Sequence, residues 1–253
     1  MKLILTLLFL AFTAYSEILL TPDNTVTIRG EINEKSIGSA QLKLAELNAL
    51  RGSRIYPIYL VLDSPGGDIN SGLSFIEYAK TIPNLHTVNL FAASMASAIQ
   101  QALPGKRIGY PYAISMFHRA AGGFQGHFSD GEVESRLDLA KQMVAILENA
   151  NAARLGVSLP DYKKKIINEY WLVGKANIID RALDEIHTVK CSNSLIELKE
   201  TISVSVFIFS IDINFSQCPM FRYGSIVKNA KDYLEHKREF NKKLTGAYYE
   251  SSN

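Results

Sequence analysis

The sequence predicts an α/β fold with a mainly parallel sheet, followed by a small α+β extension. Residues 58–62 (Ile-Tyr-Leu-Val-Leu) form a continuous apolar run, which is typical of a strand buried on both faces of a sheet. Short runs of this kind alternate with helical patterns as far as residue 190, and such alternation favours parallel strands joined by right-handed crossovers. The pattern changes after that point, so we interpret 191–253 as a separate C-terminal extension.

Each element of the α/β region is predicted from its own pattern. Strands are predicted, in order, at residues 25–29, 58–62, 87–91 and 114–117. A helix at 34–51 follows the first strand, because apolar residues recur on one stripe and Gly52 is a suitable C-terminal stop. Two further helices are predicted, one ending before Pro83 and one beginning after Ser94. The stripe of the first helix consists of Ile37, Ala40, Leu44 and Leu47.

One long helix is predicted at residues 131–155, and its apolar residues recur at alternating steps of four and three. So regular a stripe favours packing against another helix, including one from a second subunit. Within the extension, residues 201–216 alternate between apolar and polar, but the phase slips at 206–209. This slip leaves two interpretations open, one long strand with a bulge or two strands. Residues 223–244 have the pattern of a charged helix. The stripe of the long helix is Val133, Leu137, Ala140, Val144 and Leu147.

The first sixteen residues have the features of a secretory signal peptide. Lys2 supplies a positive start, residues 3–12 are almost unbroken apolar sequence, and Ala14-Tyr15-Ser16 places small residues two apart. The apolar run is about half the length that a bilayer-spanning helix needs. We therefore expect removal of residues 1–16, no membrane span afterwards, and a secreted or periplasmic protein.

Net charge and motif spacing argue against several classes of partner and cofactor. The net charge is only +2 at pH 7, without a block of one sign, so nucleic acid is not a favoured partner. No histidine or cysteine has the clustered spacing of a metal site, and the turn at 64–67 lacks the Gly-Lys-Ser/Thr ending of a phosphate-binding loop. We expect neither a metal nor another cofactor. Cys191 and Cys218 either pair as a disulfide in an oxidising compartment or remain two separate buried thiols.

Three candidate catalytic features follow the carboxyl ends of three predicted parallel strands. They are the turn Gly66-Gly67, Ser94 and His118, at the edge where open α/β sheets usually form sites. A serine at a helix start lies near free amides, and paired glycines can turn N–H groups toward an oxyanion. A histidine on a neighbouring strand can accept the serine proton and return it to a leaving amine. The same residues also suit a helix N-cap, a hydrogen-bonded strand end and a plain turn.

The sequences around these residues resemble, in order and spacing, the signature blocks of the Clp protease proteolytic subunit family. The blocks are Ser-Pro-Gly-Gly at 64–67, Ala-Ala-Ser-Met-Ala at 92–96, Met-Phe-His at 116–118 and a closing region at 171–186. The resemblance covers about residues 25–189 and implies a crotonase-like fold with a peptidase domain at 17–190. It implies that Ser94 is the nucleophile, that His118 is its base, and that the amides of Gly67 and Met95 bind the oxyanion.

The resemblance also implies substrate-binding, assembly and triad residues. A glycine-bearing segment matches a strand that aligns substrate by main-chain hydrogen bonds, and helix 131–155 matches the handle through which rings of subunits stack. The triad acid of the family is usually aspartate, but that position is Glu169 here, two residues before Trp171. Asp161 and Asp180 are the alternatives. The substrate-binding residues of the segment are Gly122, Gly123, Phe124, Gln125 and Gly126.

Together these features predict an exported serine endopeptidase that cleaves peptides or unfolded proteins and assembles as a homo-oligomer. No Clp ATPase partner is expected, because an exported enzyme has no access to ATP. One alternative is a catalytically inactive scaffold that binds peptides along residues 122–128. Another is a different member of the crotonase-like superfamily, either a signal-peptide peptidase or an acyl-thioester enzyme, although the pairing of Ser94 with His118 argues against a serine–lysine peptidase.

Overall fold

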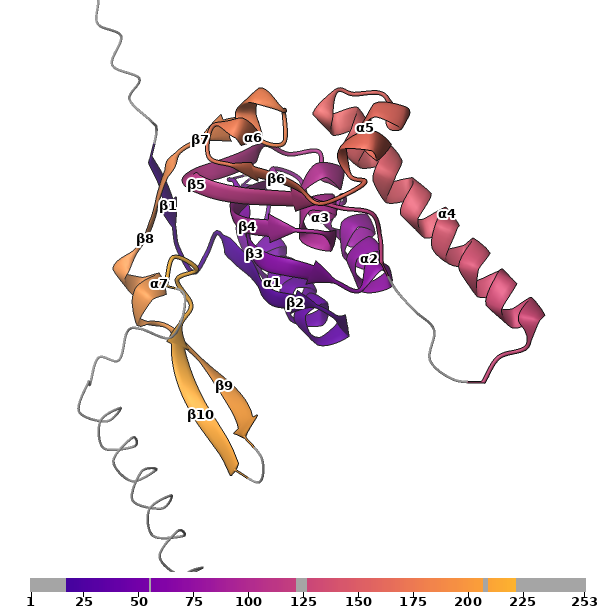
Figure 1. Cartoon of the computed structure of the whole chain (residues 1–253). Coiled ribbons are helices and arrows are strands. Elements are labelled where there is room, and N and C mark those ends of the chain that lie inside the picture. Colours follow the sequence, from indigo (N-terminus) through magenta and orange to yellow (C-terminus); the bar gives the residue numbers. More distant parts are fainter. Residues whose placement is uncertain (1–16, 55, 122–126, 207–208, 222–253) are drawn as a thin grey trace, which may run out of the picture. The chain divides into compact units, whose positions relative to one another are not determined.

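The computed structural model describes residues 17–54, 56–121, 127–206 and 209–221, and it has the predicted α/β architecture (Figure 1). The chain divides into two compact units, Met1–Lys190 and Cys191–Asn253. The elements up to the long helix are β1 (Glu17–Leu20), β2 (Thr25–Ile32), α1 (Glu34–Arg51), β3 (Ile58–Gly67), α2 (Ile69–Ala79), β4 (Leu85–Ala93), α3 (Met95–Ala102), β5 (Arg107–Phe117) and α4 (Asp130–Leu155). They are followed by α5 (Leu159–Lys165), β6 (Tyr170–Val173), α6 (Ala176–Ile179), β7 (Glu185–Ile186), β8 (Thr188–Cys191), α7 (Asn193–Glu197), β9 (Lys199–Val206) and β10 (Phe209–Ser216).

A mainly parallel sheet is the framework of the first unit. Its strand order is β2-β3-β4-β5-β6, with β7 also paired to β5. Strands β2 to β5 are mutually parallel, β6 is antiparallel to β5, and β7 is parallel to it. A short separate sheet pairs β1 with β8. The order β3-α2-β4-α3-β5 is the predicted repetition of β-α units, and it brings the carboxyl ends of three neighbouring strands to one edge of the sheet.

Helices α1, α2 and α3 share one hydrophobic core with the sheet. The predicted stripe of α1 is fully confirmed, since all four of its residues are buried in this core. The helix starts where the Asn33 side chain accepts a hydrogen bond from the Ser36 amide at 3.0 Å, and it ends at Gly52. Full burial of each large aliphatic side chain contributes about 1.5–3 kcal/mol, so this core fixes the strands that carry the candidate residues.

A second core holds the end of β5 against α4. Phe117 is packed there with Leu155 of α4, Tyr162 of α5 and Leu172 of β6. Helix α4 begins at a capping box formed by Ser129 and Glu132 and ends at Gly156. Because Phe117 is fixed by this cluster, the residue after it, His118, has a defined place beside α4.

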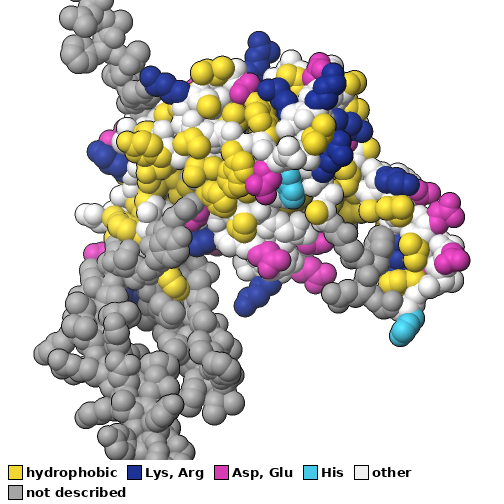
Figure 2. All heavy atoms as spheres, in the orientation of Figure 1, with side chains coloured by type: hydrophobic (Ala, Val, Ile, Leu, Met, Phe, Trp, Pro, Cys, Tyr) yellow, Lys and Arg dark blue, Asp and Glu magenta, His cyan; other side chains and the backbone are white. Residues whose placement is uncertain are grey.

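The stripe predicted on α4 is buried only toward its C-terminal end. Leu147 is buried, whereas Val133 and Leu137 are 42% and 46% exposed. Figure 2 shows hydrophobic side chains at the surface of this helix. Helix α4 therefore presents part of an apolar stripe to the outside of the single chain.

The C-terminal unit contains a β-hairpin and a disulfide. Strands β9 and β10 pair antiparallel, with Val206 opposite Phe209, so the slip in sequence phase corresponds to two strands. The disulfide joins Cys191 to Cys218. The predicted helix at 223–244 and the predicted signal peptide at 1–16 lie outside the described residues. Within the part of the chain that the structure describes, no helix combines the length and apolarity needed to cross a bilayer.

Reducing the Cys191–Cys218 disulfide is expected to destabilise the C-terminal unit. The bond joins residues 27 apart in sequence, and a loop of that length corresponds to about 3–4 kcal/mol in the chain-entropy treatment. Thermal unfolding followed with and without reductant measures the effect. A variant with both cysteines changed to serine should unfold at the lowered temperature with or without reductant. A wild-type unfolding curve that reductant leaves unchanged would contradict the expectation.

Candidate active site

Ser94 lies at the sharp junction between β4 and α3. Its backbone angles are φ 54° and ψ −120°, on the positive-φ side that non-glycine residues seldom adopt. The Ser94 amide donates to the carbonyl oxygen of Met116 at 2.9 Å, which ties the junction to β5. Helix α3 begins at the next residue, so its first-turn amides lie beside the Ser94 side chain. Backbone strain of this kind concentrates at functional positions.

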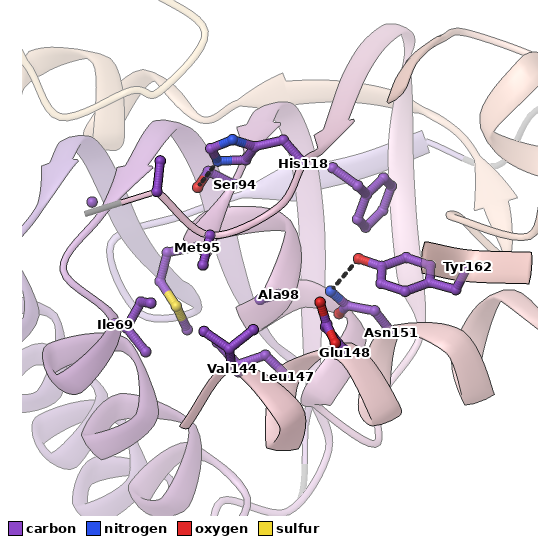
Figure 3. Close-up of a pocket in the computed structure, with 14 residues that line it drawn as sticks. Ile69, Ser94, Met95, Ala98, His118, Val144, Leu147, Glu148, Asn151 and Tyr162 are labelled. Carbon is purple, nitrogen blue, oxygen red and sulfur yellow. Dashed lines mark hydrogen bonds between the residues drawn. The ribbon is translucent and has the colours of Figure 1, made fainter. Parts of the chain in front are cut away.

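His118 is within hydrogen-bond distance of Ser94. The register of β4 and β5 places Ala93 opposite Met116, and His118 follows two residues later at the same edge of the sheet. The His118 Nε2 atom lies 2.7 Å from Ser94 Oγ (Figure 3). An imidazole nitrogen at this distance from a hydroxyl is placed to accept its proton.

The glycine turn at the end of β3 is packed directly against the Ser94 junction. Gly66 and Gly67 have φ values of 97° and 147°, which favour glycine. A Cβ atom at Gly66 would lie 2.6 Å from Ser94 Cβ and 2.8 Å from the Met95 amide nitrogen. A Cβ atom at Gly67 would collide with the backbone of Ile32. From the sequence, glycine was expected at these two positions because it lets the backbone turn its amides toward an oxyanion. The close approach of neighbouring backbone is a second physical reason for glycine here.

The acid predicted to orient His118 has another partner. Glu169 is exposed, and its carboxylate accepts a hydrogen bond from Trp171 Nε1 at 2.9 Å. The alternatives lie elsewhere, since Asp161 bonds Ser158 and Lys164, and Asp180 pairs with Lys165. Among the described residues, no carboxylate is hydrogen-bonded to His118. The orienting role of Glu169 therefore stays a prediction.

A pocket opens beside Ser94 between α2, α3, α4 and α5. It contains four residues that the sequence indicated, Gly67, Ser94, Met95 and His118, and three polar residues that sequence reasoning missed. The missed residues are Glu148, Asn151 and Tyr162. Asn151 had a detectable signal, because it lies four residues after Leu147 and continues the apolar stripe of α4 with a polar side chain.

The polar part of the pocket is partly closed off from water. Asn151 Nδ2 donates to the Tyr162 hydroxyl at 2.8 Å (Figure 3). Burial raises the pKa of Tyr162 to about 12, despite the opposing hydrogen bond from Asn151. Tyr162 therefore stays a neutral hydrogen-bonding group at physiological pH.

The substrate-aligning residues Gly122, Gly123, Phe124, Gln125 and Gly126 lie outside the described residues. Ser97, one turn after Ser94, is buried and donates to the Ala92 carbonyl at 2.6 Å. This internal bond explains Ser97 as part of the packing at the start of α3.

Comparison with known families agrees with the resemblance in the local motifs. A family model described as Clp protease matches residues 11–186, which is more than half of the chain. The matched region contains the parallel strands, the glycine turn, Ser94 and His118. It stops before the disulfide-bonded C-terminal unit begins at Cys191. The chain belongs to the Clp protease family.

Proposed function

We propose that this protein is a serine endopeptidase that hydrolyses peptide bonds in peptides or unfolded proteins. The observation that carries the proposal is the 2.7 Å distance between His118 Nε2 and Ser94 Oγ. These two side chains lie at the carboxyl edge of parallel strands, next to a glycine turn and the start of a helix. Family membership supports the same reaction class.

In the proposed reaction, Ser94 Oγ attacks the carbonyl carbon of the scissile peptide bond. His118 Nε2 accepts the hydroxyl proton and then donates it to the nitrogen of the leaving amine. The amides of Gly67 and Met95 stabilise the oxyanion of the tetrahedral intermediate, which is the step where preorganised donors have the largest effect. Water then attacks the acyl-enzyme with His118 as base, which regenerates Ser94 and releases the acid product.

We further propose that the enzyme is exported, forms homo-oligomers and acts without an ATP-driven unfoldase. The signal-like sequence at 1–16 and the Cys191–Cys218 disulfide support export, because disulfides persist in oxidising compartments. The exposed apolar residues Val133 and Leu137 on α4 support assembly through that helix.

Labelling with a fluorophosphonate tests the proposed nucleophile. Treatment of the purified full chain, followed by proteolytic digestion and mass spectrometry, should place the covalent adduct on Ser94, because the His118 imidazole lies within hydrogen-bond distance of its hydroxyl. The His118→Ala variant should form the adduct much more slowly. An adduct on a different serine would refute the assignment of Ser94.

A second candidate function is a peptide-binding scaffold without catalysis. It is favoured by the engagement of Glu169 with Trp171, which leaves His118 without a hydrogen-bonded carboxylate within the described ranges. A protein that binds peptides, forms no fluorophosphonate adduct and cleaves no substrate across a broad pH range would favour this scaffold over the peptidase.

A further inference from the structure

The pocket beside Ser94 has apolar walls on one side and polar walls on the other. Figure 3 shows Ile69, Met95 and Val144 on the apolar side. Glu148, Asn151 and Tyr162 lie together on the opposite side, where α4 faces α5. A ligand that fills this pocket therefore contacts apolar surface on one side and hydrogen-bonding groups on the other.

Asn151 contributes an acceptor that is not satisfied within the described chain. The residue is only 6% exposed, and its Nδ2 group is used by Tyr162. Its Oδ1 atom is buried without a hydrogen-bond partner among the described residues. A buried acceptor in this state costs about 1–3 kcal/mol, so a ligand that brings a donor to this oxygen gains the missing bond.

Glu148 adds a negative charge to the same wall. Its side chain is 15% exposed and lies 3.1 Å from Lys163 Nζ. Lys163 is 50% exposed, so water solvates its ammonium group and weakens its attraction to Glu148. Figure 2 shows dark-blue Lys and Arg side chains at the surface in the region of α5. Lys163 can therefore return to solvent when a second cation reaches the Glu148 carboxylate from inside the pocket.

We propose that this pocket receives the side chain on the acyl side of the cleaved bond, and that Glu148 and Asn151 select a basic residue, lysine or arginine, there. The inference rests on the proposed peptidase function. The methylene groups of a lysine or arginine stem pack on Met95, Val144 and Leu147, and the charged end supplies N–H donors. The Glu148 carboxylate and Asn151 Oδ1 are the acceptors that these donors match.

Peptide substrates that differ only at the acyl-side residue test the proposal. Lysine, arginine and norleucine are compared in an otherwise identical fluorogenic peptide, because norleucine keeps the apolar stem of lysine and lacks its charge. We expect kcat/KM for the lysine or arginine peptide to exceed that for norleucine by about tenfold or more. Glu148→Gln should reduce this ratio by about tenfold. Glu134→Gln, a matched change at an exposed position of the same helix, should leave it unchanged.

The possible outcomes separate this proposal from the peptidase function on which it rests. If Ser94 forms the fluorophosphonate adduct but norleucine is cleaved as well as lysine and arginine, the selection of basic residues is refuted and the peptidase function stands. A preference for basic residues that survives in Glu148→Gln refutes the role of Glu148, provided that the variant still forms the adduct. Absence of both adduct and hydrolysis refutes the peptidase function, and the pocket proposal falls with it.

Discussion

Replacing Ser94 with alanine is expected to lower kcat for peptide hydrolysis by about 10⁴- to 10⁶-fold. The change removes the only hydroxyl found 2.7 Å from His118 Nε2 within the described residues, and losses of this order accompany removal of the nucleophile from a serine peptidase. The small residual rate comes from the oxyanion donors and substrate binding. Initial rates with a fluorogenic peptide at saturating concentration measure the effect, and circular dichroism checks that the fold is retained.

Two further variants sharpen this prediction. Ser74→Ala is a matched control, because Ser74 lies exposed on α2 and is not among the residues that line the pocket; this variant should keep full activity. Ser94→Ala combined with His118→Ala should be no slower than Ser94→Ala alone, since the two groups act as one unit. If the loss in rate of the double variant equalled the product of the losses in the two single variants, Ser94 and His118 would be acting independently.

Replacing Arg107 with methionine is expected to lower the free energy of unfolding of the first unit by about 3 kcal/mol or more. Arg107 is 4% exposed and pairs with Asp184. Its guanidinium also donates to the carbonyl of Arg181 at 2.7 Å and to the side chain of Gln101. Breaking a buried pair costs about 3–5 kcal/mol because the partners are left unmatched. We expect a loss near the lower end of this range, because the Asp184 side chain is 35% exposed.

The neighbouring residue provides the control for Arg107. Lys106 pairs with Glu185 at the surface, where the two side chains are 57% and 36% exposed. Lys106→Met should therefore leave the free energy of unfolding, measured by urea denaturation, nearly unchanged. Equal losses in the two variants would show that burial of Arg107 is not what makes its interactions strong.

Acidification should reduce the difference in free energy of unfolding between the wild type and Arg107→Met. Burial alone would raise the pKa of Asp184, but hydrogen bonds and charge from Arg107 outweigh burial and hold this pKa below its ordinary value. A carboxyl whose pKa is lowered by folding stabilises the protein above its unfolded pKa of about 3.9, and this contribution disappears as the pH falls through the folded pKa. The difference should therefore be full near pH 7 and smaller below about pH 4.

Apolar runs were sufficient to predict the central strands of the sheet, but not the full length of β5. Residues 58–62 and 87–91 lie within β3 and β4, whereas the strand predicted at 114–117 is only the last part of β5. Its first part contains Pro111 and the exposed Tyr112, which interrupt an apolar pattern. Pairing with β4 and β7 extends this strand back to Arg107, and such pairing depends on contacts distant in sequence.

The candidate site shows the same division between local and tertiary information. Ser94 and His118 could be placed together because the carboxyl ends of neighbouring parallel strands meet at one edge. The partner of Glu169 could not be predicted, because its orientation depends on the packing of Trp171, whose ring stacks on Phe91 from another strand. The polar wall at Glu148 and Asn151 likewise depends on how α4 packs against α5.

The unusual backbone of Ser94 limits which amino acids evolution can place at this position. At a φ of 54°, a β-branched residue is strongly disfavoured, so threonine is a poor substitute although it carries a hydroxyl. Cysteine has the same unbranched shape as serine and meets no such steric obstacle. If Ser94 is the nucleophile that we propose, cysteine is therefore almost the only other nucleophilic side chain that this backbone accommodates.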